Sequence, residues 1–504
     1  MSVSSWRRCG AAVLVAAVGL IAAACQTPSV PLPLGVVPAA TGLPAGAQDG
    51  TLTVPLTCSL PILGNTTFIL NMSGVGGTLV GPGQSFYLTA GHGSLTVPAS
   101  LIALSGIVGT ASVQTTLTDV EFNASNATPS SINIAKTPIS VSTPIVAGQP
   151  TKVRIPSAGD LTIGPFTAGP SGVVQMTMGA STATITLLNA SGGTILVPLT
   201  VTCAAPTPPV VLVGLTIGGP SGQPVQRYDG LTVGDATLPA GFVEGSLALP
   251  LTCSVTGIGS VPIVGELTGS LPAYLPEGNN YYFQDGSGIL EFPASVVTSI
   301  VATTGASRIS GSITTLNFTA TGSTPASLNG AATPIPVAPV PLTAGQGLNI
   351  GIPQSGVLTI GPFTPIAGAP LSTLVLGTSG GTLQPEDASG NAIGSPLAVS
   401  CGAPDPATIL LQEPNTTGTV PTVGVIAPLT GPAAGGTSVT LTGTGFTGAL
   451  AVNFGNTYAA SFTVNSDTSI TVTTPPHPAG EVDVTVLGPQ GPSPTVTQDY
   501  FTYQ

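Results

Sequence analysis

The chain has 504 residues and few charged side chains, with 7 Lys and Arg against 19 Asp and Glu and a net charge of -12. Nucleic-acid binding needs clustered cations that neutralise phosphates, so this composition excludes a DNA or RNA partner. The hydrophobic fraction of 42% is that of a folded protein. Frequent Val and Thr, interrupted by 67 Gly and 51 Pro, favour short strands joined by turns and predict an all-β fold.

The first 24 residues have the pattern of an export signal: two arginines, then an apolar stretch that is short for a membrane span. Two cleavage interpretations compete at one bond. Ala22 and Ala24 suit an ordinary signal peptidase, whereas "LIAAAC" resembles a bacterial lipobox, which would make Cys25 the lipidated first residue of the mature chain. Lipidation would account for a cysteine that lacks a partner in an oxidising compartment. We therefore expect a protein of the cell envelope, lipid-anchored to the outer face of the membrane or secreted, and attached to the membrane only through that anchor.

The central part of the chain is a duplicated module, expected over residues 42–205 and 237–403. "LPAGAQDGTLTVPLTC", which ends at Cys58, recurs as "LPAGFVEGSLALPLTC", which ends at Cys253, and "LTIGPFT" occurs in both copies without change. Alternating apolar and polar residues predict strands with one buried face. Each copy is long enough for a two-sheet β-sandwich with its own core.

Three segments have the composition of linkers. Residues 25–41 follow the export signal, residues 206–236 contain "PTPP" and "GGPSGQP", and residues 404–420 contain "APDPA" and "EPNTTG". We expect 206–236 to be a linker or a capping insert, and the other two to be linkers.

Each copy of the module contains one cysteine near its start and one near its end. The simplest connectivity joins Cys58 to Cys203 and Cys253 to Cys401, so that each disulfide ties the first strand of a copy to its last. The alternative, metal ligation, lacks short Cys spacing and a neighbouring His. As a whole, the module resembles paired-Cys domains of unknown function in exported actinobacterial proteins, a resemblance that implies no activity.

Residues 421–504 differ in pattern from the two copies. They contain, in order, "PTVGVIAP", "GPAAGGTSVTLTGTGF", "VNFG", "SDTSITVTTPP", "AGEVDVTV" and "YFTY". This series strongly resembles an IPT/TIG domain, which implies an immunoglobulin-like β-sandwich. Similar domains occur in surface receptors, as accessory modules of carbohydrate-active enzymes, and in transcription factors. The last role needs basic loops, and no Lys or Arg follows Arg308. The expected architecture is three tandem β-sandwich domains.

Within this domain Gly443, Gly445 and Gly448 have the G-x-G-x-x-G spacing of a dinucleotide-binding turn. In that turn the third glycine opens a helix that faces the pyrophosphate. Here Gly448 leads into "ALAVNFG", which alternates as a strand does. The glycines are better interpreted as turn residues of a sandwich, and no cofactor is expected.

The sequence offers little for catalysis. His92 and His477 lie far in sequence from any Cys, second His or acidic pair, so each is interpreted as a solvated or structural loop residue. Ser379 in "GTSGG" matches a nucleophile motif that requires an α/β sheet. We expect no catalytic residue and no metal site. The aromatic cluster "NNYYF" makes Tyr281 and Tyr282 the candidate ligand contacts, with strand-edge or hairpin packing as the alternative.

These features predict a non-enzymatic cell-envelope protein, a structural, adhesive or ligand-binding β-sandwich array at the bacterial surface. Its expected partner is a cell-envelope glycan or a surface protein. The alternative function is a polysaccharide-active enzyme or an accessory carbohydrate-binding subunit, which would need paired carboxylates in an aromatic groove.

Overall fold

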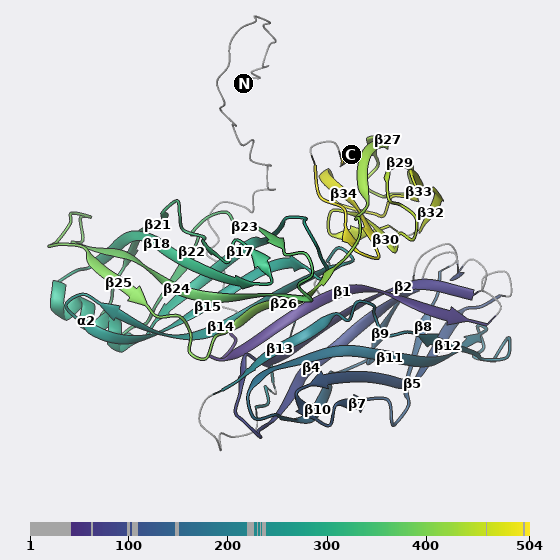
Figure 1. Ribbon diagram of the computed structural model, residues 1–504, viewed down its shortest axis with the longest axis horizontal. Coiled ribbons are helices and arrows are strands. Elements are labelled where there is room, and N and C mark those ends of the chain that lie inside the picture. The colour runs from purple at the N-terminus through teal and green to yellow at the C-terminus, as the bar shows by residue number, and fades with distance from the viewer. Residues whose placement is uncertain are drawn as a thin grey trace, which may run out of the picture.

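A computed structural model describes residues 42–504, except 62–63, 98–100, 103–108, 147–150, 219–225, 229, 232, 234–237, 460 and 497–498. The predicted export signal, the 25–41 linker and Cys25 lie outside the described residues. The described chain is built almost entirely of strands, which confirms the all-β prediction (Figure 1).

The first module is a two-sheet sandwich. Its strands are β1 (Ala47–Leu60), β2 (Gly64–Gly77), β3 (Leu79–Val80), β4 (Ser85–Val97), β5 (Ser112–Ser125), β6 (Ala127–Thr128), β7 (Ser131–Asn133), β8 (Ile139–Pro144), β9 (Thr151–Ile155), β10 (Leu161–Ala168), β11 (Gly172–Leu188), β12 (Leu199–Cys203) and β13 (Val211–Ile217). One sheet runs β9-β4-β2-β1 and the other runs β8-β5-β11-β13. Strand β5 shows why they stack: Leu117 and Phe122 are buried in one apolar cluster, and a bulge between Leu117 and Asp119 keeps both on the buried face although an odd number of residues separates them.

The second module repeats this plan. Its elements are β14 (Phe242–Val255), β15 (Gly259–Pro272), β16 (Leu275–Pro276), β17 (Tyr281–Phe292), α2 (Ala294–Thr304), β18 (Arg308–Thr321), β19 (Ser323–Thr324), β20 (Ser327–Asn329), β21 (Ile335–Pro341), β22 (Leu348–Ile352), β23 (Leu358–Pro365), β24 (Leu371–Glu386), β25 (Leu397–Cys401) and β26 (Ile409–Thr416). Helix α2 was not anticipated from the sequence, because its β-branched residues favour strands. Burial of Val296, Val297 and Ile300 in the core of the second module compensates for that preference, and the helix ends at Gly305 with φ of 69°.

The two modules are joined edge to edge rather than linked as separate domains. Strands β1 and β14 pair antiparallel over Gln48–Thr53 and Phe242–Leu247, so β9-β4-β2-β1 continues into β14-β15-β17-β22. Gly50 lies opposite Gly245, its own counterpart in the other copy. A pseudo-two-fold axis therefore passes through this glycine pair.

The two sheets that contain β13 and β26 meet differently beneath the β1–β14 pairing. Strands β13 and β26 are counterparts that pair with β11 and β24 respectively, and they lie side by side beneath the β1–β14 join. They contact each other without a backbone ladder; Thr216 Oγ1 donates to the Ala407 carbonyl at 2.8 Å. We call this contact line the β13/β26 seam. It corrects the linker interpretation of 206–236 and 404–420, since each segment contains a sheet strand.

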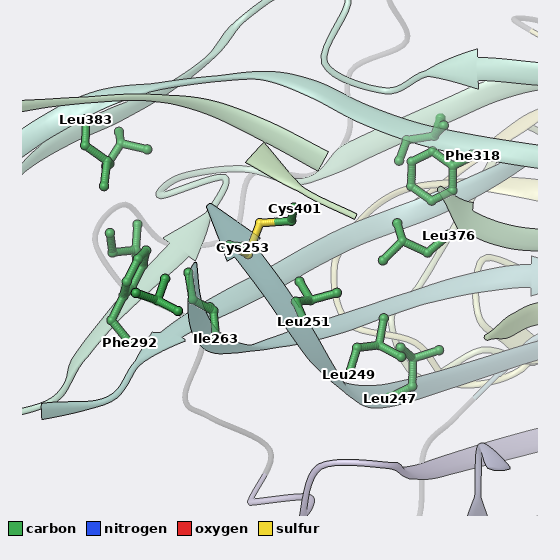
Figure 2. Close-up of a cluster of buried hydrophobic side chains, with 14 of the residues drawn as sticks. Leu247, Leu249, Leu251, Cys253, Ile263, Phe292, Phe318, Leu376, Leu383 and Cys401 are labelled. Carbon is green, nitrogen blue, oxygen red and sulfur yellow. A yellow bond between two sulfur atoms is a disulfide. The ribbon is translucent and has the colours of Figure 1, made fainter. Parts of the chain in front are cut away.

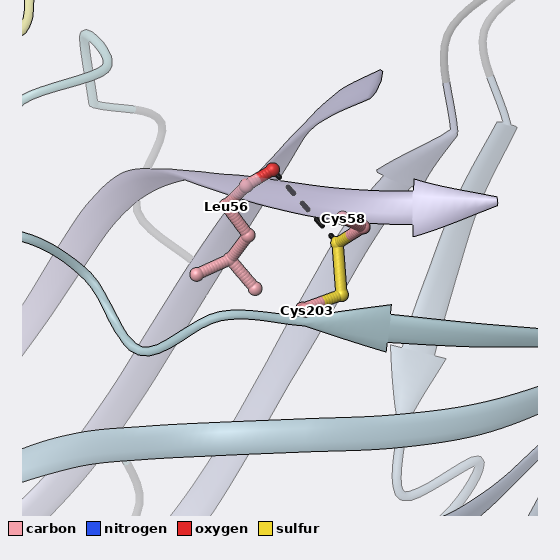
Figure 3. The surroundings of a disulfide bond; sticks show 3 residues. All are labelled: Leu56, Cys58 and Cys203. Carbon is pink, nitrogen blue, oxygen red and sulfur yellow. Dashed lines mark hydrogen bonds between the residues drawn. A yellow bond between two sulfur atoms is a disulfide. The ribbon is translucent and has the colours of Figure 1, made fainter. Parts of the chain in front are cut away.

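Each module is tied by the disulfide that the sequence predicted. Cys58 is bonded to Cys203 across 145 residues and Cys253 to Cys401 across 148 residues, which confirms both pairings. Figure 2 shows the second disulfide within the buried side chains of its module, and Figure 3 shows the first beside Leu56. Because the paired cysteines lie opposite each other on adjacent strands, each bond links β1 to β12 or β14 to β25.

The C-terminal domain is a separate sandwich. Its strands are β27 (Thr422–Ala427), β28 (Thr430–Gly431), β29 (Ser438–Thr444), β30 (Ala451–Phe454), β31 (Thr457–Tyr458), β32 (Ser461–Ser466), β33 (Ser469–Thr473), β34 (Gly480–Gly488), β35 (Gly491–Pro492) and β36 (Tyr500–Tyr503). One sheet runs β27-β29-β33-β32 and the other β28-β36-β34-β30-β31. Phe446, Phe454 and Phe501 are fully buried between them and form part of the core of the domain.

This domain is docked over the join of the two modules (Figure 1). Leu487 is fully buried in a cluster with Ala240 and Tyr274 of the second module and with residues of the first. Asn453, also fully buried, accepts from the Ala240 amide at 2.9 Å and donates to the Ala240 carbonyl at 3.3 Å. The contact is an apolar core with satisfied polar groups, which is the character of a stable interface.

Candidate functional site

The structure separates the two tyrosines of the predicted contact site. Tyr281 is 4% exposed, stacks on Phe363 with ring centroids 5.6 Å apart, and shares a hydrogen bond with Ser323 at 3.1 Å. It is a core residue, which corrects the prediction that it contacts a ligand. Tyr282 is partly exposed and lies over Gly361; its role as a contact stays a prediction.

The first copy contains the signal that could have identified Tyr281 as a core residue. The counterparts of Tyr281 and Tyr282 are Phe86 and Tyr87 in "SFYL". Phe86 is fully buried and stacks on Phe166 at 5.6 Å. An aromatic pair that recurs at one position of a duplicated fold is a packing feature of that fold.

The other singled-out residues also occupy structural positions. His92 lies in strand β4 rather than in a loop; it is 9% exposed, with Nδ1 3.1 Å from the Ala90 carbonyl and 3.5 Å from Asp160 Oδ1. His477 stacks on Tyr503 at 5.1 Å. Ser379 lies within strand β24, where no strand-to-helix turn exists.

The glycine motif of the C-terminal domain is a turn between strands. Gly443 lies within β29, opposite Val423, whereas Gly445 and Gly448 follow the strand with φ of 70° and 80°, and strand β30 begins at Ala451. A positive φ has little energetic cost only for glycine. The interpretation as turn residues is confirmed for Gly445 and Gly448, and Gly443 is a strand residue.

The interior of the first module contains a cavity of about 240 Å³. It extends between the two sheets and passes beneath the β1–β14 join to the first strands of the second module. Its lining is mostly apolar, from Leu56 and Phe68 near the disulfide to Phe283 and Leu411 of the second module. A cavity of about 150 Å³ in a protein core holds benzene. This cavity therefore has room for a larger apolar molecule.

Two adjacent polar residues of β26, Gln412 and Glu413, line the cavity at the seam. Gln412 is 9% and Glu413 3% exposed. Burial raises the pKa of the Glu413 carboxyl well above its ordinary value, opposed by the Val211 amide, which donates to Oε2 at 3.5 Å. Burial thus favours the neutral form of the Glu413 carboxyl. Neither residue was predicted from the sequence, because "LLQEPN" has the composition of a linker.

A second acidic group lines the cavity beside the join. Asp49 accepts from the Ser246 amide at 3.0 Å, across the β1–β14 pairing. Burial raises its pKa, the hydrogen bonds of Ser246 oppose the shift, and the nearby Glu266 adds to it. Among the described residues, no Lys or Arg lines the cavity. Its interior thus disfavours an anionic ligand.

In the described chain, no three His, Cys, Asp or Glu side chains are grouped as metal ligands would be. Over the same residues, no helix is both long and apolar enough to cross a bilayer.

Comparisons with known proteins identify one part of the chain. The IPT/TIG family model matches residues 421–503. No curated protein matches the chain. One similar solved structure is SGBP-B of the mixed-linkage glucan utilization locus of Bacteroides ovatus in complex with a mixed-linkage heptasaccharide. It has 11% identity and a TM-score of 0.15, over 51% of this chain and 63% of that one.

A second similar structure is the full extracellular region of plexin A4, with 11% identity and a TM-score of 0.16, over 84% of this chain and 28% of that one. This chain thus spans less than two thirds of either structure. TM-scores this low carry no conclusion about the arrangement of the modules. The family match and the two-sheet topology agree at the C-terminus: residues 421–503 are an IPT/TIG domain, immunoglobulin-like in fold.

Proposed function

We propose that the protein is a non-enzymatic, exported binding protein of the cell envelope, and that the paired modules bind an apolar molecule in their shared interior. The observation that carries this proposal is the cavity of about 240 Å³. Protein cores are normally packed with few voids larger than a water molecule. A cavity of this size costs stability unless it is filled, so binding of a ligand gives it a physical reason.

The scaffold around the cavity suits binding more than catalysis. Two disulfides, the β1–β14 join and the docked IPT/TIG domain hold the cavity walls in place. Preorganised walls reduce the ordering cost of binding. The alternative function as a polysaccharide-active protein required an exposed aromatic cluster at Tyr281 and Tyr282. Tyr281 is buried, so only Tyr282 of this pair could contact a polysaccharide.

The location in the envelope is part of the proposal. Disulfide-tied modules are typical of oxidising compartments, which is compatible with export. Lipidation of Cys25 predicts a mature N-terminus with an acylated cysteine. Mass spectrometry of the N-terminal peptide tests this directly, and an unmodified Cys25 or a different first residue would reject the anchor.

The binding proposal is tested with the full mature chain and phenylnaphthylamine, a neutral probe that fluoresces in apolar surroundings. We expect saturable binding that Ala183→Phe, which fills the cavity from strand β11, weakens by about tenfold or more. Ala326→Phe, at an exposed position of the second module, is the matched control and should bind as the parent does. Equal binding by the parent and Ala183→Phe, or no binding at all, would reject the proposal, provided that both variants unfold cooperatively.

A further inference from the structure

The polar end of the cavity differs between the two copies of the module. Both β13 and β26 pair with the preceding long strand, with the same register shift, so Gly214 and Leu215 are the counterparts of Gln412 and Glu413. Leu215 is 1% exposed, which shows that the fold accepts a leucine at this position. The duplicated architecture itself therefore does not require the buried carboxyl of Glu413.

The hydrogen bonding of this end is incomplete. Gln412 Nε2 has Thr373 Oγ1 at 3.4 Å, whereas the buried Gln412 Oε1 has no hydrogen-bond partner within the described chain. Glu413 receives one long hydrogen bond, from the Val211 amide at 3.5 Å. Buried acceptors normally have a donor, because an unsatisfied buried acceptor destabilises the fold. This end of the cavity thus presents a buried acceptor on Gln412 and, on the next residue of β26, the carboxyl of Glu413.

The walls decide which charge a ligand can carry. An anion would lie near Asp49 and Glu413, and no Lys or Arg is among the described lining residues, which include His92. An ammonium group would have to leave water for a mostly apolar lining, which is costly. A hydroxyl matches either group, because it can donate to Gln412 Oε1 or to a carboxyl oxygen of Glu413 and can also accept a hydrogen bond.

We propose that the cavity binds an uncharged, elongated apolar molecule that carries a hydroxyl group at one end, with Gln412 and Glu413 as the recognition residues. This proposal rests on the proposed function and names its ligand class. The long, mostly apolar lining, which runs from Cys58 to Leu411, takes the chain of the molecule. The unpaired β13/β26 seam, where these side chains rather than a backbone ladder join the strands, lies at the hydroxyl end.

The test compares decanol, decanoate and decylammonium as competitors of phenylnaphthylamine on the full mature chain at neutral pH. We expect decanol to bind about tenfold or more tightly than either ion. Glu413→Leu, which installs the residue of the other copy, should weaken decanol by about tenfold while phenylnaphthylamine still binds. The same variant should unfold at a higher temperature, because it removes a buried carboxyl.

The matched control is Glu386→Gln, at a buried glutamate outside the cavity, which should leave decanol binding unchanged. Equal affinities for the three competitors, or full decanol binding by Glu413→Leu, would overturn the ligand class while leaving the cavity a binding site. Loss of stability in Glu413→Leu with unchanged decanol selectivity would show that Glu413 only supports the seam. Failure of phenylnaphthylamine to bind the parent protein would reject the proposed function itself.

Discussion

Replacement of Asn453 by Ala should uncouple the IPT/TIG domain from the paired modules. Asn453 is fully buried and makes three hydrogen bonds: two with the Ala240 backbone, at 2.9 and 3.3 Å, and one to Thr485 at 3.2 Å. Alanine removes them and leaves the Ala240 amide and carbonyl buried without these partners. An unsatisfied buried group costs about 1–3 kcal/mol, so we expect a loss of about 2–4 kcal/mol from the free energy of docking.

Hydrogen exchange shows which amides become less protected when the free energy of docking is reduced. The Ala240 amide should lose protection in Asn453→Ala, whereas amides of β29 and β33, within the IPT/TIG core, should keep theirs. Asn465→Ala is the matched control: its side chain is exposed and donates only within the same domain, to Ser469 and Thr471. We expect the control to change stability by less than about 0.5 kcal/mol. Unchanged exchange at Ala240 in Asn453→Ala would refute the assigned role of Asn453.

Three further predictions follow from the described contacts. Replacing Cys253 and Cys401 by Ala should destabilise the second module by about 3–5 kcal/mol, because the bond closes a loop across 148 residues; a denaturant titration that gives no shift would contradict this. Burial raises the pKa of Asp499 from its ordinary 3.8 to about 6, so the unfolded state ionises first and stability falls as pH rises from about 4 to 6. Asp499→Asn should therefore raise the unfolding temperature at pH 7 but hardly at pH 4. An equal rise of the unfolding temperature at both pH values would exclude an effect of the Asp499 charge. Gly241→Ala should destabilise more than Gly257→Ala, since both glycines have positive φ but only at Gly241 would the Cβ lie 2.8 Å from an IPT/TIG side-chain atom; equal melting temperatures would contradict the close docking.

Several features of the fold can be predicted from the sequence, because they depend on local or repeated patterns. Alternation gave the strands of each copy, and the recurrence of a cysteine at the start and end of both copies indicated the pairing of Cys58 with Cys203 and Cys253 with Cys401. The ordered motifs of the C-terminal domain identified the IPT/TIG fold. Helix α2 was not predicted, because a run of Val, Thr and Ile has strand propensity. Its packing against the core stabilises the helical conformation.

The candidate site was less accessible to sequence reasoning than the fold. Tyr281 has the composition of a contact residue, yet its ring stacks inside the sandwich. Gln412 and Glu413 have the composition of a linker, yet they lie buried in a strand. A two-residue alternation tells which residues share a face of a strand, and it does not tell whether that face is covered.

The duplication, the all-β class, the two disulfides and the IPT/TIG domain could all be predicted from the amino-acid sequence, since each follows from residues near in sequence or from comparison of the copies. Two features become apparent only in the folded chain: the copies share one sheet through Gly50 and Gly245, and the IPT/TIG domain is docked over their join. Local patterns do not predict such pairing, because edge strands pair through backbone groups that every sequence carries. Which edges meet, and which polar side chains become buried there, depends on long-range packing that no local pattern records.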